Sequence, residues 1–218
     1  MVIVGHDYGA PEMSVVINVA DSWGVKPDAR VGILGGSFNP AHEGRLHISA
    51  LAREHLKLDH VIWMVSPQNP LKPETEMAPF VERFDGAVQM ASADTSVIVS
   101  DIEVQLGTRY SADTLKTLKS MSPKMAIVWI MGADNLAQID RWESWGTIFS
   151  TVPIAIFARP PYSNGVMACT AAEDFADSQL GESRGAELAL LPPPAWIYFD
   201  TPLNSKSATR IRTGCEPE

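Results

Sequence analysis

The sequence contains only two cysteines among its 218 residues, Cys169 and Cys215, and they lie far apart in the chain. This excludes a disulfide framework and a four-cysteine zinc site, and it is typical of a reducing compartment, so we expect a cytoplasmic protein. No apolar run approaches the ~18 residues that a membrane span needs. The first 28 residues also lack the basic segment and long apolar stretch of a secretory signal, so we expect no membrane association.

Positive charge is scarce as well. The chain has 17 Lys and Arg against 26 Asp and Glu, and its formal net charge is −9 at pH 7. This balance argues against a basic surface that binds nucleic acid. Hydrophobic residues make up 45% of the chain, which is enough for a sizeable core. The length favours a single domain, and we expect an N-terminal extension over residues 1–28 and a domain over residues 29–214. Whether the protein forms a homo-oligomer is left open.

The signatures of several common enzyme classes are missing. The first glycine turn, Gly32-x-x-Gly35-Gly36, lacks the G-x-G-x-x-G spacing of dinucleotide dehydrogenases, and no Gly-Lys pair is present for a Walker A loop. His42 and His47 are five residues apart, which sets their rings roughly 140° apart on a helix and does not suit a zinc protease. A G-x-S-x-G elbow is also absent, so a serine hydrolase is disfavoured.

Short apolar runs alternate with helical patterns along the chain. We expect strands at 30–34, 61–65, 96–99, 125–131, 153–158 and 196–199, helices at 42–56, 80–91, 111–121 and 207–212, and a loop over 178–194. This alternation predicts an α/β fold, a Rossmann-like doubly wound parallel sheet with helices on both faces. In such sheets ligands bind at the carboxyl ends of the strands, near the point where the strand order reverses.

Two segments have the composition of phosphate-binding sites. The first is GGSFNPAHEGR, from Gly35 to Arg45, where glycines and a helix N-terminus can approach an anion closely. A tight turn with His42 as a helix cap is the alternative interpretation. The second is SATRIR, from Ser207 to Arg212, whose hydroxyls and two guanidinium groups suit phosphate oxygens. A capped surface helix would have a similar sequence.

In this order the two segments resemble the G-x-F-x-P-x-H-x-G-H and S-S-T-x-x-R signatures of the nucleotidyltransferase α/β phosphodiesterase superfamily. Three further segments, SPQNPLK at 66–72, GTRYSADTL at 107–115 and MGADN at 131–135 followed by Trp142, are similar to those of its bacterial nicotinate-nucleotide adenylyltransferases. The resemblance extends from residue 30 to residue 212. It departs from the signatures at Arg45, which stands at the second histidine of H-x-G-H, and mildly at Ala208. His47, about 200° further round the helix, cannot replace that histidine.

The resemblance implies that the adenylyl group of ATP is transferred to nicotinate mononucleotide, with Mg²⁺ bound through the ATP phosphates and no metal site made by the protein itself. His42 would donate to an α-phosphate oxygen, Arg45 would act as a permanent cation, and Arg212 would close on the β- and γ-phosphates. The residues implied to bind ATP are Gly35, Gly36, Ser37, Phe38, His42, Arg45, Gly132, Asp134, Ser207, Thr209 and Arg212. Those implied to bind the mononucleotide are Lys72, Thr108, Asp113 and Trp142.

Other interpretations remain open at several of these positions. Lys72 is equally compatible with a solvated loop, Asp134 with a helix N-cap, Asp113 with a helix start and Trp142 with the core. The alternatives to the implied activity are another transferase of the superfamily, such as a pantetheine-phosphate adenylyltransferase or a cytidylyltransferase, and a non-catalytic nucleotide-binding relative, which only Arg45 suggests. The choice between nicotinate and nicotinamide mononucleotide is not readable from the sequence.

Overall fold

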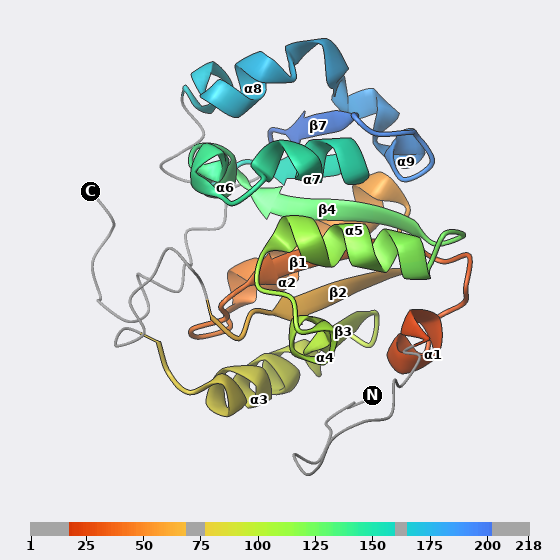
Figure 1. Cartoon of the computed structure of the whole chain (residues 1–218), viewed down its shortest axis with the longest axis vertical. Helices are drawn as coiled ribbons and strands as arrows, with labels where there is room; N and C mark the ends of the chain where they lie inside the picture. The colour runs from red at the N-terminus through yellow and green to blue at the C-terminus, as the bar shows by residue number, and fades with distance from the viewer. Residues whose placement is uncertain (1–17, 69–76, 160–164, 202–218) are drawn as a thin grey trace.

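A single parallel sheet forms the centre of the molecule. The computed structural model describes residues 18–68, 77–159 and 165–201. Within them, all paired neighbours are parallel and the strand order is β3-β2-β1-β4-β5-β7-β6 (Figure 1). The strands are β1 (Arg30–Gly36), β2 (His60–Val65), β3 (Val97–Ser100), β4 (Ala126–Gly132), β5 (Ile154–Phe157), β6 (Gln179–Leu180) and β7 (Trp196–Phe199).

The strand order reverses between β1 and β4. From β1 the chain adds β2 and then β3 on one side, and it returns to place β4 on the other side of β1. The two strands pair in register from Arg30 with Ala126 to Leu34 with Ile130. A doubly wound sheet opens a crevice at the carboxyl ends of such a strand pair. The fold therefore predicts a ligand site just beyond β1 and β4.

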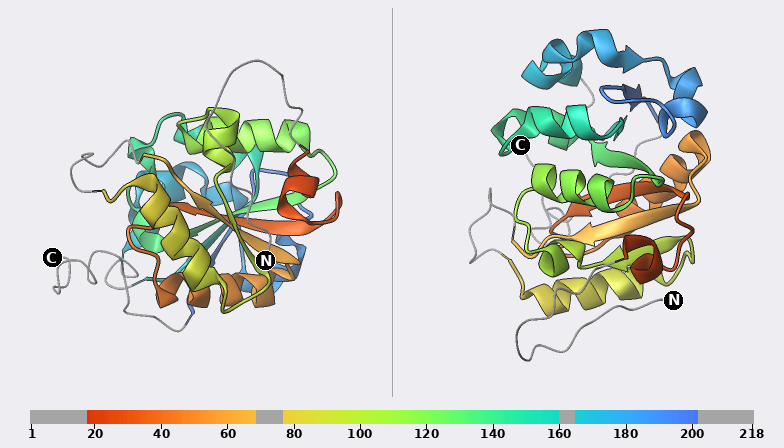
Figure 2. Two further views of the ribbon diagram at one scale, coloured as in Figure 1. Left: turned by 90° about the horizontal axis from the view of Figure 1, so that it is seen from below. Right: turned by 45° about the vertical axis from the view of Figure 1, so that its right-hand side comes forward.

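Helices cover both faces of the sheet, as the sequence predicts. One face packs against α1 (Val19–Trp23), α4 (Ile102–Leu106), α5 (Ser111–Met121) and α7 (Trp145–Thr151), and the other against α2 (Glu43–Leu56), α3 (Phe80–Ala91) and α9 (Gly185–Leu188) (Figures 1 and 2). Each face has its own hydrophobic core. In β1, Ile33 is buried in the core on the side of α5 and α7, and Leu34 is buried in the core on the side of α2 and α3. Each strand is thus apolar on both sides, which explains the continuous hydrophobic runs in the sequence.

Short helical segments fill the remaining connections. They are α6 (Ala133–Leu136), α8 (Thr170–Asp174) and 3₁₀ turns at Ile139–Arg141, Val166–Ala168, Ala176–Ser178 and Glu182–Arg184. Among the described residues, no helix has the length and apolar character needed to cross a membrane.

The predicted elements that fall within the described residues are confirmed to within two residues at each end. The predicted helix at 207–212 lies outside them. The loop predicted over 178–194 is wrong in part, because this stretch holds β6, a 3₁₀ turn and α9. These elements are too short and too polar to produce a periodic pattern, and they are defined by packing, since Leu188 is fully buried in the core.

Helix α1 lies within the predicted N-terminal extension. Its Trp23 is 3% exposed, and the indole Nε1 donates to Ser100 Oγ at 2.9 Å. Val19 and Ala20 are buried in the same core cluster. Residues 19–23 are therefore part of the packed core, while the division of the whole chain into an extension and a domain stays a prediction.

The far end of α2 packs closely against α9 and β7. A Cβ on Gly185 would lie 2.8 Å from the carbonyl oxygen of His55 and 3.2 Å from the ring of Phe199, so only glycine allows this approach. The rings of His55 and Phe199 are 5.1 Å apart. Helix α2 is thus fixed at its C-terminal end to the part of the chain that precedes β7.

Candidate active site

A cleft opens at the carboxyl ends of β1, β4 and β5, beside the first turns of α2. This is the edge of the sheet where the strand order reverses, as the topology predicts. Its polar lining includes side chains from four places in the fold. His42 and Arg45 lie at the start of α2, Asn135 follows β4, and Arg159 and Thr201 follow β5 and β7.

Arg45 is held by the loop that precedes its own helix. Its guanidinium lies over the ring of Phe38, and Nη1 donates to the carbonyl oxygen of Gly35 at 3.3 Å. A Cβ on Gly36 would lie 2.5 Å from Arg45 Nη2, so the glycine leaves the space that the guanidinium fills. Phe38 is buried and packs on Trp63, with 5.2 Å between ring centroids. The Gly-Gly-Ser-Phe turn is therefore shaped around Arg45.

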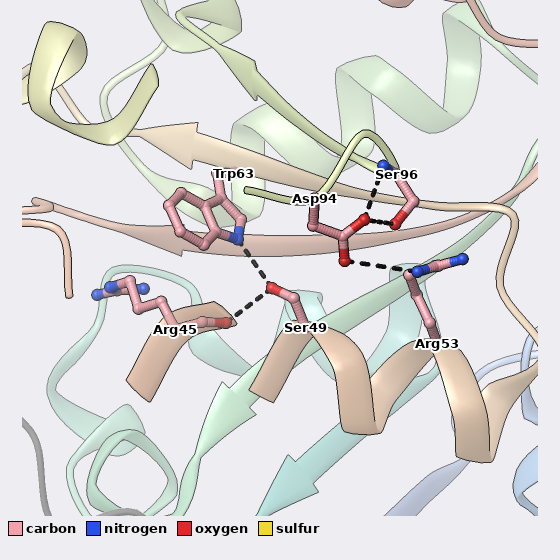
Figure 3. Close-up of polar contacts among 6 residues, drawn as sticks. All are labelled: Arg45, Ser49, Arg53, Trp63, Asp94 and Ser96. Carbon is pink, nitrogen blue, oxygen red and sulfur yellow. Dashed lines mark hydrogen bonds and ion pairs between the residues drawn. The ribbon is translucent and has the colours of Figure 1, made fainter. Parts of the chain in front are cut away.

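Helix α2 is anchored to the sheet by polar contacts along its length (Figure 3). Ser49 Oγ donates to the carbonyl oxygen of Arg45 at 2.8 Å, and it accepts from the indole Nε1 of Trp63 at 2.8 Å. One turn further on, Arg53 pairs with Asp94 at 3.5 Å. Because Trp63 belongs to β2, these contacts fix the orientation of the helix that carries Arg45.

His42 occupies the N-cap position of α2, but its side chain makes no capping hydrogen bond. The ring is 4% exposed, and its Nδ1 has no hydrogen-bond partner among the described residues. Burial first, and then the charges of Arg45 and Arg159, lower the pKa of His42 to about 3. The imidazole is therefore neutral at pH 7, with one N–H to donate. The alternative interpretation of His42 as a helix-cap residue is confirmed for its position, although its side chain makes no capping hydrogen bond.

Asp134 and Arg159 form an ion pair across the ends of β4 and β5. Arg159 Nη1 donates to Asp134 Oδ2 at 2.8 Å, and both side chains are about four-fifths buried. The second carboxylate oxygen, Oδ1, is buried without a partner among the described residues. A Cβ on Gly132 would collide with that oxygen, so the glycine that ends β4 gives the carboxylate its space.

Arg159 is absent from the site that the sequence predicts. The signal that could have indicated it is its place directly after the strand predicted at 153–158, at the sheet edge where ligands bind. None of the five motif segments quoted above includes this position.

The cleft carries a local positive charge in an acidic protein. Burial and the charge of Arg159 lower the pKa of Arg45 to about 10, although Asp134 opposes this shift, so Arg45 remains charged at pH 7. The two guanidinium groups and one carboxylate leave a net charge of about +1 beside the neutral His42. The N-terminus of α2 adds its positive dipole end. This arrangement suits a polyanion such as a polyphosphate.

One carboxylate beside the cleft is available to a metal ion that arrives on a substrate, that of Asp134, whose partner Arg159 lines the cleft. In the part of the chain that the structure describes, no group of three or more His, Cys, Asp or Glu side chains is arranged to hold a metal. The unpartnered Oδ1 of Asp134 offers one carboxylate oxygen. Mg²⁺ is commonly held by one or two carboxylates and by substrate phosphates, with water completing its shell.

The other predicted site residues lie away from the cleft or outside the described residues. Lys72, Ser207, Thr209, Arg210 and Arg212 belong to the second group. Thr108 Oγ1 is 2.7 Å from Thr114 Oγ1, on the segment between α4 and α5. Asp113 is exposed in the first turn of α5, and Trp142 packs partly buried against the core on that face. None of these three lines the cleft.

Comparisons with known proteins agree with this geometry. Residues 33–214 match the family described as "Cytidylyltransferase-like". A protein of Parvibaculum lavamentivorans named "Probable nicotinate-nucleotide adenylyltransferase" is 48% identical over 186 residues, which cover 85% of this chain and 92% of that protein. A Caulobacter sp. protein of the same name is 46% identical over 183 residues, covering 84% and 96% of the two chains.

A solved structure gives the same result for the fold. The Plasmodium falciparum nicotinic acid mononucleotide adenylyltransferase complexed with NaAD superposes with a TM-score of 0.65 at 15% identity, covering 84% of this chain and 82% of that one. The chain therefore belongs to the cytidylyltransferase-like family, a family of nucleotidyltransferase enzymes. Within it, the identity to the curated relatives makes the chain a member of the nicotinate-nucleotide adenylyltransferases.

Proposed function

We propose that this protein transfers the adenylyl group of ATP to nicotinate mononucleotide, giving nicotinate adenine dinucleotide and pyrophosphate, as a step of NAD biosynthesis. The observation that carries the proposal is the convergence of His42 and Arg45 on one cleft at the N-terminus of α2, in a chain that is 48% identical to a relative bearing this name. Two hydrogen-bond donors that are buried and lack a full set of partners there are matched by a phosphate ligand.

The loop after β1 and the start of α2 bind the ATP phosphates in this proposal. The backbone of Gly35, Gly36 and Ser37 approaches the phosphates closely, and the ring of Phe38 supports Arg45. The neutral His42 donates its N–H to an α-phosphate oxygen, while Arg45 supplies a charge that stays in place over the whole physiological pH range. Such preorganised donors stabilise the charge that develops as the transferred group changes partners.

Gly132 and Asp134 bind the ribose of ATP. Asp134 Oδ1 can accept a hydrogen bond from a ribose hydroxyl, because its other oxygen is already occupied by Arg159. Ser207, Thr209 and Arg212 are proposed to bind the β- and γ-phosphates, because their hydroxyl and guanidinium groups suit phosphate oxygens. Lys72, Thr108, Asp113 and Trp142 are proposed to form the mononucleotide side.

The reaction needs no general base. An oxygen of the mononucleotide phosphate attacks the α-phosphorus of ATP, a new P–O bond forms, and the bond from the α-phosphorus to the bridging oxygen of the β-phosphate breaks. The electron pair leaves with pyrophosphate. A phosphate monoester has a second pKa near 6 and is largely a dianion at neutral pH, so no proton has to be removed. The work of the protein is to bring two polyanions together in line and to neutralise their charge.

Mg²⁺ bound through the ATP phosphates would supply further charge neutralisation, and Asp134 is the described carboxylate best placed to meet it. The scarcity of cysteine supports a cytoplasmic location for this reaction. The charge balance supports a small-molecule role without nucleic-acid or membrane partners.

One assay tests the proposal. Purified protein is mixed with Mg-ATP and, in separate reactions, nicotinate mononucleotide, nicotinamide mononucleotide or phosphopantetheine, and pyrophosphate release is followed by a coupled enzyme. A parallel series replaces ATP with CTP. We expect turnover with ATP and nicotinate mononucleotide. Turnover with phosphopantetheine or with CTP alone would identify another transferase of the family, and ATP binding without pyrophosphate from any acceptor would identify a non-catalytic relative.

A further inference from the structure

Two buried ionisable side chains lie outside the cleft and have no part in the proposed chemistry. Arg83 on α3 is 3% exposed, and Glu103 on α4 is 1% exposed. Burying a charged group is costly unless it is fully hydrogen-bonded, so each must be retained for what it holds in place. Their hydrogen bonds meet at a third residue, Ser66, which directly follows β2.

Arg83 connects the loops that follow β1 and β2. Its Nη1 donates to the carbonyl oxygens of Ser37 at 2.5 Å and Ser66 at 2.8 Å, and its Nη2 donates to that of Pro67 at 2.7 Å. Its Nε donates to the carbonyl oxygen of Ala78 at 2.9 Å. Ser37 belongs to the phosphate-binding loop, and Ser66 and Pro67 begin the segment that leads toward the acceptor. One guanidinium therefore sets the spacing between these two loops.

The geometry requires an arginine. Four carbonyl oxygens surround the guanidinium, and only a planar group with donors on three nitrogens reaches them all. A lysine at this position has only one side-chain nitrogen and cannot reach all four carbonyl oxygens. Burial lowers the pKa of Arg83, and the four hydrogen bonds that its guanidinium makes with described residues all go to carbonyl oxygens and none to a carboxylate.

Glu103 extends the same network to the segment after β3. Its Oε2 accepts from Ser66 Oγ at 2.6 Å, and its Oε1 accepts from Thr114 Oγ1 at 3.3 Å. Thr114 Oγ1 is in turn 2.7 Å from Thr108 Oγ1. Thr108 lies on the segment between α4 and α5 that is proposed to face the mononucleotide. A continuous path of hydrogen bonds thus runs from Ser37 to Thr108 along the carboxyl edge of β1, β2 and β3.

We propose that Arg83 and Glu103, joined through Ser66, are positioning residues that hold the ATP-phosphate loop and the acceptor-side loops in one fixed arrangement for adenylyl transfer. This inference rests on the proposed function. The physical reason is that in-line attack needs the reacting atoms within about 3–3.5 Å, and a displacement of about 1 Å can lower a rate by about 10²-fold. Neither side chain lines the cleft, so each acts through the loops that it holds.

The first test separates positioning from folding. Arg83→Lys and Arg83→Gln are compared with Arg184→Lys, a control whose arginine pairs with Glu187 at the surface and bonds neither loop. We expect the Arg83 variants to lower kcat by about 10- to 10²-fold, while the Kd of ATP measured alone changes by less than about threefold. Arg184→Lys keeps the wild-type kcat. If the Arg83 variants lose activity only in proportion to the fraction of unfolded protein, or if Arg184→Lys loses as much kcat, the proposal is wrong.

A second set of variants tests the connection through Ser66. Glu103→Gln keeps the shape and can still bond hydroxyls, so it should retain more of kcat than Glu103→Ala. The kcat losses of Arg83→Lys and Glu103→Ala should be less than multiplicative when combined, because both disturb one network. Full multiplicativity would show that the two side chains act independently and would remove Ser66 as their link.

Amide hydrogen exchange gives a readout that does not depend on activity. In Arg83→Lys, exchange should become faster over residues 37–39 and 107–110, and in Arg184→Lys it should remain as in the wild type at both segments. A wild type without turnover would contradict the proposed function alone and leave this measurement valid. Unchanged exchange at both segments in Arg83→Lys would contradict the network itself.

Discussion

The guanidinium of Arg45 lies over the ring of Phe38, with its central carbon 4.1 Å from the ring centroid. The residue that stands at the second histidine of the signature is therefore packed on the loop between β1 and α2, within its own motif. A cation over an aromatic face gains about 0.5–1 kcal/mol at exposed sites and more where it is desolvated, and the contact leaves the edge of the guanidinium available for hydrogen bonds. Arg45 is thus a fixed cation.

Substitutions at Arg45 and Phe38 should distinguish the contribution of the positive charge from that of its position. Arg45→Ala should lower kcat/KM for ATP by about 10²-fold, because a preorganised donor and its charge are lost. Arg45→Lys should keep part of the activity, and Phe38→Leu should weaken ATP binding through the loss of the support beneath Arg45. Steady-state kinetics with pyrophosphate release measures all three. Wild-type kinetics in Arg45→Ala would show that this cation has no role in the reaction.

His42→Ala should lower kcat by about 10²–10³-fold, the usual effect of removing one donor to a developing charge. The Kd of ATP should change far less, because the neutral imidazole contributes no net charge to the bound state before reaction. Isothermal titration and single-turnover rates give the two quantities separately. His60→Ala serves as the histidine control, because His60 lies at the N-terminal end of β2 and does not line the cleft. A loss confined to ATP affinity would make His42 a binding residue only.

Two glycine substitutions should have different effects, one on the KM for ATP and the other on stability. Gly36→Ala places a methyl group 2.5 Å from Arg45 Nη2, so it should displace the guanidinium and raise the KM for ATP by about tenfold, equivalent to about 1.4 kcal/mol. Gly86→Ala lies within α3, and its methyl group would meet no atom within 4 Å. It should stabilise the protein by about 0.5–1 kcal/mol without changing kinetics. Thermal unfolding and ATP kinetics on both variants check the pair, and an unaltered KM in Gly36→Ala would contradict the fit around Arg45.

The buried His42 should make the protein less stable as the pH falls. Its folded-state pKa is about 3 and its unfolded value is about 6.5, so between these limits the unfolded chain binds a proton that the folded protein excludes. The protonation of His42 in the unfolded chain has little effect on the free energy of unfolding above about pH 6.5. Below that pH it lowers the free energy of unfolding, by about 1 kcal/mol between pH 6.5 and 5.5. The Tm advantage of the wild type over His42→Ala should therefore shrink by about 2–4 °C over that interval. A constant difference would show that His42 titrates normally.

The sequence predicts the parts of this protein that follow repeating patterns. The alternation of apolar runs gives the parallel sheet, and the glycines between Gly35 and Gly44 give the turn into α2, because both depend on local backbone chemistry. The position of the cleft follows from the strand order alone.

Residues defined by tertiary contacts are not readable in the same way. Arg159 pairs with Asp134 across 25 residues, and Arg83 reaches Ser37 across 46. Nothing in the neighbourhood of either arginine in the sequence indicates its partner. The functions of Arg83 and Glu103 depend on which carbonyl and hydroxyl groups the fold brings to one sheet edge, and only the three-dimensional arrangement shows this.

Helix α2 connects the cleft directly to the packing around Gly185 and Phe199. At about 1.5 Å per residue, its 14 residues separate the cleft from the contact with Gly185 by roughly 20 Å. The helix is rigid, and its C-terminal end packs closely against Gly185. A displacement of that end is therefore transmitted along the helix to Arg45. A side chain introduced at Gly185 would push on the carbonyl of His55, and the displacement would emerge at the substrate end of the helix.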